Sequence, residues 1–182
     1  LNTAALLRGS TEFYADLCLA PESAHHLLAK VTEAAAIAAR HLFDYLGRPP
    51  TPFTNQIGIH LGDQIHLSDD CCVNLSPAFI ETFDLAYVRE LSRRLSAPFC
   101  THYCVLPQSP AEQCLEPMCA CEATPSLLNQ YTPEYFLENY DLFEGRLALV
   151  SQKGPYGAGL GASPRQRLDN FRAWAEDFLG RF

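Results

Sequence analysis

Apolar residues at helical spacing dominate the first quarter of the chain. We expect Ser10 to cap a helix, because a serine hydroxyl can accept a hydrogen bond from a free amide of the first turn, and Phe13 and Leu17 follow it at helical spacing. Pro21 suits the first turn of a second helix, where its missing N–H is no loss. From there apolar residues recur every three or four positions up to Leu46. We therefore expect a short helix and then a long one.

The apolar period then changes to two. Ile65 and Leu67 alternate with His66 and Ser68, after a similar alternation over 57–61, which predicts a strand. Further elements are predicted from cap-and-proline starts and short apolar runs: a helix from 76 to about 95, a strand over 97–104, a helix from 132 to before 145, a strand over 146–151 and a last helix from 163. The segment 105–130 is expected to be loop-rich, with one short helix or strand. Alternating strands and helices favour a parallel sheet with crossover helices.

Composition limits the class of protein. With 182 residues, 48% of them hydrophobic and 19% charged, the chain suits one globular domain over 1–182. A net charge of −8 without a run of Lys or Arg argues against nucleic acid and an anionic membrane as partners. The chain lacks an apolar stretch of about 18 residues and a signal peptide, so we expect a cytoplasmic protein. Six of the eight cysteines crowd into 71–119 and a seventh is Cys121, which favours reduced thiols over an oxidised, exported scaffold.

His102 and Cys104 are the first candidates for chemistry. Residues two apart in a strand point to the same side, so an imidazole and a thiolate would project together. Both are ligands that Zn²⁺ accepts, and a catalytic zinc takes three protein ligands, of which Cys119 or Cys121 could be the third. The alternative is a buried thiol beside a histidine satisfied by the core, with loop cysteines that share no role.

Polar residues around the first predicted strand are the second candidates. Asp69 and Asp70 follow that strand and could bind a substrate cation, take a proton or orient a ligand; their alternative role is to cap the turn before the next helix. His66 alternates out of the strand and is a candidate for cofactor binding or for packing.

Several segments together resemble the uroporphyrinogen decarboxylase superfamily. They occur in the family's order and run through nearly the whole chain: LRGS at 7–10 followed by YADL at 14–17 and PE at 21–22, SDDCCVNLSP at 68–77, THYC at 101–104, GRLAL at 145–149 and GASP at 161–164. The resemblance implies a (β/α)₈ TIM barrel, of which this chain would be the C-terminal portion, with the active site at the carboxyl ends of the strands.

The resemblance also implies an activity. One branch of the superfamily decarboxylates a tetrapyrrole without a cofactor. The other transfers a methyl group between a corrinoid and a thiol such as coenzyme M, using zinc held by His-x-Cys and a distant Cys. His102 and Cys104 match the first two zinc positions, whereas Val105 replaces the expected Gly and the late Cys-containing strand is absent.

From these observations we expect zinc-dependent methyl transfer, with a thiol and a corrinoid, free or on a corrinoid protein, as reactants. A tetrapyrrole decarboxylase and a non-catalytic corrinoid- or tetrapyrrole-binding protein are the alternatives. Because only three or four strands are predicted where a barrel has eight, we expect the chain to self-associate or to belong to a longer polypeptide.

Overall fold

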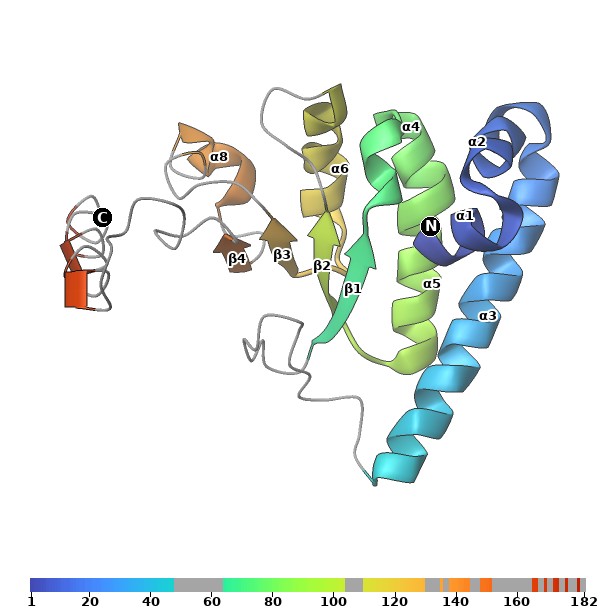
Figure 1. Cartoon of the computed structure of the whole chain (residues 1–182), viewed down its shortest axis with the longest axis horizontal. Helices are drawn as coiled ribbons and strands as arrows, with labels where there is room; N and C mark the ends of the chain where they lie inside the picture. The colour runs from blue at the N-terminus through green and yellow to red at the C-terminus, as the bar shows by residue number, and fades with distance from the viewer. Residues whose placement is uncertain are drawn as a thin grey trace.

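A computed structural model describes residues 1–47, 64–103, 110–129, 135, 138–144 and 148–151, together with single positions or pairs between 165 and 180. Three helices at the amino end are followed by a small parallel sheet with further helices between its strands (Figure 1). The first part of the predicted strand, over 57–61, lies outside the described residues, as do Cys104 and the start of the predicted helix at 163.

The amino-terminal helices are α1 (Asn2–Arg8), α2 (Ser10–Leu19) and α3 (Pro21–Leu46). The last two match the predicted short and long helices, whereas α1 was not predicted. The predicted cap at Ser10 is wrong: Ser10 is the first residue of α2, and Gly9 is the N-cap, without a side-chain hydrogen bond. The buried residues of α3 are spaced four apart at Ala24, Leu28, Thr32 and Ala36, so one stripe of the helix faces the core. Gly47 ends α3 in the left-handed conformation (φ 59°), which glycine adopts without strain.

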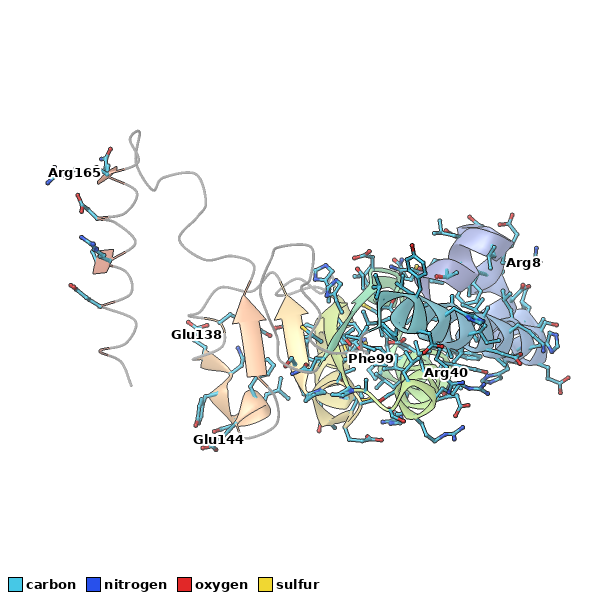
Figure 2. All side chains as sticks on the ribbon, turned by 90° about the horizontal axis from the view of Figure 1, so that it is seen from below. Arg8, Arg40, Phe99, Glu138, Glu144 and Arg165 are labelled. Carbon is cyan, nitrogen blue, oxygen red and sulfur yellow. The ribbon has the colours of Figure 1, made fainter. Side chains whose placement is uncertain are left out.

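The helical segment after the first strand is less regular than predicted. The 3₁₀ turn η1 (Cys71–Asn74) leads to Ser76, whose hydroxyl caps α4 (Pro77–Phe79). A π-helical segment, η2 (Ile80–Leu85), then continues into α5 (Ala86–Leu95). Near the end of α5, Arg40 of α3 donates a hydrogen bond to the carbonyl of Arg94, and α3 and α5 lie side by side there (Figures 1 and 2).

Four parallel strands form the sheet in the order of the chain: β1 (Ile65–Asp69), β2 (Phe99–Tyr103), β3 (Ser126–Asn129) and β4 (Ala148–Ser151). Between β2 and β3 the chain forms η3 (Pro110–Cys114) and α6 (Leu115–Ala120), and α8 (Tyr140–Phe143) precedes β4. The segment 105–130 thus holds both a helix and a strand, where one of the two was predicted.

The prediction of a TIM barrel is wrong. In the part of the chain that the structure describes, most residues are helical and the sheet has four strands, with β1 and β4 at its two edges. A closed barrel of this class needs eight strands that return to pair with the first. Alternation of strands and helices is common to open and closed parallel sheets, so the pattern that predicted parallel strands could not establish closure.

Successive residues of β1 and β2 point to opposite sides of the sheet. Leu67 and Asp69 line a cavity with residues of α3 and α5, and Tyr103 is paired with Asp69 on the same side. We call this the helix-facing side. The intervening residues, among them His66 and His102, belong to the other side. The core is built on the helix-facing side, where Phe99 and Tyr103 are each 1% exposed.

The described residues contain neither a membrane-spanning helix nor a disulfide. No helix among the described residues is long and apolar enough to cross a bilayer. The described cysteines form no disulfide with one another: Cys18, Cys71, Cys72, Cys100, Cys114, Cys119 and Cys121 are all thiols.

Candidate active site at the carboxyl edge of the sheet

His102 occupies the last but one position of β2, at the edge where parallel strands end. Its side chain is 6% exposed, and its Nε2 lies 3.5 Å from Oδ1 of Asp70, the residue that follows β1. The register places Ser68 of β1 opposite His102, so the two neighbouring strands end together. The structure therefore brings together one predicted metal ligand and one predicted catalytic carboxylate.

Asn2 holds Asp70 in place. Its Nδ2 donates to Oδ2 of Asp70 (3.2 Å) and to the carbonyl of Ser68 (3.2 Å), and its Oδ1 accepts from the amides of Asp70 and Cys71 (3.0 Å each). One amide group thus fixes both the backbone and the side chain at the end of β1. Sequence reasoning missed this residue, because no local pattern links an asparagine at position 2 to a turn almost 70 residues later.

A row of polar side chains crosses the sheet one step before His102. His66, Cys100 and Ser126 are paired in register on three adjacent strands. Both ring nitrogens of His66 and Oγ of Ser126 are buried and have no hydrogen-bond partner among the residues that the structure describes. Burial, and after it the nearby His102, lowers the pKa of His66, so its imidazole is neutral at neutral pH and presents an unused acceptor.

Cys100 is unsuited to act as a nucleophile. It is fully buried in the middle of that row, and burial raises its pKa to about 11. The thiolate is the reactive form of cysteine, and at neutral pH this residue is a thiol. Cys100 therefore contributes packing and a weak S–H donor to the site.

The carboxylates of Asp69 and Asp70 lie on opposite sides of the sheet. Although the two were predicted to act at one place, Asp69 points to the helix-facing side, where it is 2% exposed and approaches Asp84. The alternation of side chains along a strand separates consecutive residues in this way. Of the two carboxylates, Asp70 alone approaches His102 among the contacts that the structure gives.

The two cysteines proposed as a third zinc ligand lie elsewhere. Cys119 is buried within α6, and Cys121 is buried directly after that helix. Cys121 is close enough to Tyr103 and Arg89 to affect their pKa values, which places it on the helix-facing side. The described residues contain no group of three His, Cys, Asp or Glu side chains that could hold a metal ion. The third-ligand assignment to Cys119 or Cys121 thus has no geometric support, and Cys104 lies outside the described residues.

Comparison with protein-family models, with characterised proteins and with solved structures finds no match to the chain. The function must therefore be argued from the geometry of the site and from the resemblance of the sequence segments.

Proposed function

We propose that the chain is an enzyme that acts on a small molecule at the carboxyl edge of the sheet, with His102 as its central functional group. The observation that carries this proposal is the contact between His102 and Asp70 across the ends of two adjacent parallel strands. Parallel α/β sheets bind ligands outside the carboxyl ends of their strands, because the strands end there while loops are free to vary.

Asp70 and His102 form a carboxylate–histidine pair of the kind that fixes the orientation of the imidazole ring. A carboxylate beside one ring nitrogen fixes the ring and leaves the other nitrogen to a metal ion, a proton or a substrate. Asn2 in turn fixes the carboxylate, so the ring orientation is determined by three residues from three segments. His66 lies nearby, and neither of its ring nitrogens has a partner among the described groups, so it supplies a further acceptor that a bound molecule could use.

For the reaction itself we propose methyl transfer to a thiol within the uroporphyrinogen decarboxylase superfamily, with His102 and Cys104 as ligands of zinc. An oriented, buried imidazole fits a zinc ligand, whereas the described residues do not complete the ligand set. Zinc would supply one thing, a lowered pKa of the bound thiol. The structure supports two contributions of the chain to this reaction: Asp70 orients His102, and burial of the His102 side chain keeps water away from its ring.

Elemental analysis of the purified protein and of His102→Ala tests the zinc assignment. We expect about one zinc per chain in the wild type and less than a tenth of that in the variant, because a catalytic zinc has only three protein ligands. Cys18→Ala is the matched control, since Cys18 is exposed on α2, and its zinc content should equal that of the wild type.

Two outcomes would change the proposal. Equal zinc in wild type and His102→Ala would remove His102 from the metal site. A wild type without zinc that nevertheless consumes a tetrapyrrole would favour the decarboxylase branch over methyl transfer.

A further inference from the structure

A second cluster of ionisable groups lies on the helix-facing side of the sheet. Asp69 ends β1 and is 2% exposed, while Asp84 belongs to η2 and is 1% exposed. The two carboxyl groups are close enough to interact as hydrogen-bonding partners. Oδ1 of Asp69 and Oδ2 of Asp84 are buried and receive no hydrogen bond from a donor among the described groups.

Both carboxyl groups line a cavity of about 110 Å³ between β1, α3 and α5. Its walls are largely apolar and include Leu28 and Val31 of α3 and Leu91 of α5. In surroundings of this kind a carboxylate loses its hydration without gaining an equivalent partner. Two ionised carboxylates in contact there would also repel each other strongly.

The other ionisable groups around the pair do not balance two negative charges. The amino nitrogen of Leu1 lies 3.5 Å from Oδ2 of Asp69. Tyr87 of α5 lines the cavity, and Tyr103 of β2 interacts with both carboxylates. Tyr14 of α2 interacts with Asp69, and the neighbouring η1 adds Cys71 and Cys72. On the side of α3, His25 contacts Tyr87. No described Lys or Arg residue lines the cavity. Without a cationic side chain among the described residues to balance two negative charges, one acid carries a proton.

We propose that Asp69 and Asp84 form a proton-binding site, in which one shared proton ties the end of β1 to η2 at neutral pH. One carboxyl group donates its O–H to an oxygen of the other, which satisfies an oxygen on each side of the contact. Because Asp70 follows Asp69 directly, this contact also fixes the backbone from which Asp70 reaches His102. The site does not depend on the function proposed for His102.

The pH dependence follows from the direction of the shift. Burial, and after it the charge of Asp69, raises the pKa of Asp84 well above its ordinary value of 3.8. Between these two values the folded chain keeps a proton that the unfolded chain releases. The contribution of this pair to stability is therefore fully present at low pH and is lost as the pH rises from about 4 through the pKa of the folded state.

Asp84→Asn tests the proposal, because an amide N–H replaces the shared proton and does not titrate. Melting temperatures of wild type and variant would be compared from pH 5 to pH 8. We expect the melting temperature of the variant, relative to that of the wild type, to rise by about 3 °C or more from pH 5 to pH 8. One pKa unit corresponds to a shift in melting temperature of that order in a chain of this size. Asp141→Asn, an exposed substitution in α8, should show no such gain.

An infrared spectrum keeps the proposal testable if the variant does not fold. Wild type at pH 7 should show the carbonyl stretch of a protonated carboxyl group shielded from water, and Asp69→Asn or Asp84→Asn should lack it. A wild type without this band, or parallel melting curves of wild type and Asp84→Asn from pH 5 to pH 8, would overturn the proposal.

Discussion

Asp69 and Asp70 are adjacent in the chain, yet the structure gives them opposite surroundings. Asp69 is buried against Asp84 on the helix-facing side, whereas the side chain of Asp70 is 54% exposed and lies beside His102 at the sheet edge. The same carboxyl chemistry is thus used in one place to hold a proton and in the other to orient a ring. The difference shows that position on the strand, more than residue type, decides what an acid does.

The same contrast applies to the thiols and gives the largest expected effect. Cys100 is fully buried with its pKa raised from 9.0 to about 11, while Cys18 is exposed on α2. A rise of two units lowers the thiolate fraction by about 100-fold. We expect iodoacetamide at pH 8 to label Cys18 at least that much faster than Cys100, as measured by mass spectrometry of peptides. Similar rates would mean that the polar row on β1–β3 is open to solvent.

Asn2→Ala should have the next largest effect, this time on stability. The substitution removes four hydrogen bonds at the end of β1 and leaves the amides of Asp70 and Cys71 without their acceptor. We expect a loss of about 2 kcal/mol in the free energy of unfolding, measured by denaturant titration. Asn74→Ala is the matched control, since Asn74 donates a single bond to Tyr14 and should cost about 1 kcal/mol or less.

Sequence reasoning reached the elements and part of the site, and its failures have physical causes. α3 and β2 were predictable because caps, proline and apolar period are local signals. Ser76 was likewise identified as a cap. The closure of the sheet was not predictable, because it depends on strand pairs that lie far apart in sequence, and the barrel drawn from family resemblance is wrong.

The site was predictable only where strand geometry is local. Placing His102 and Asp70 near strand ends followed from alternation and from the order of elements. The separation of Asp69 from Asp70 follows from the same alternation, although the two were treated as one pair. Asn2 could not be found from sequence, because its contact is with Asp70, a residue far away in the chain. Asp84 could not be found either, because its role depends on the side of the sheet to which Asp69 points.

Thr101→Val is expected to have a smaller effect, in the stabilising direction. Thr101 lies between Cys100 and His102 in sequence, but its side chain points to the helix-facing side, where it is fully buried. Its Oγ1 has no hydrogen-bond partner among the described groups. Valine has nearly the same shape, so the substitution removes an unsatisfied oxygen without opening a cavity. The free energy of unfolding should rise by about 1 kcal/mol. A loss of stability would show that the hydroxyl has a partner that the structure does not describe.

The smallest effect on stability should come from Asp70→Asn, and it separates the two neighbouring acids most directly. The side chain is half exposed, and an asparagine oxygen can still accept the hydrogen bond from Asn2, so the free energy of unfolding should change by about 0.5 kcal/mol or less. His102, however, loses the negative charge beside its ring. If His102 binds zinc as proposed, zinc affinity should fall about 10- to 100-fold, because that is the usual cost of removing the carboxylate behind a metal-bound histidine. Denaturant titration and competition with a zinc chelator measure the two quantities on the same sample. Unchanged affinity with unchanged stability would leave Asp70 as a surface residue, whereas a large loss of stability would place it with Asp69 among the groups that hold the fold.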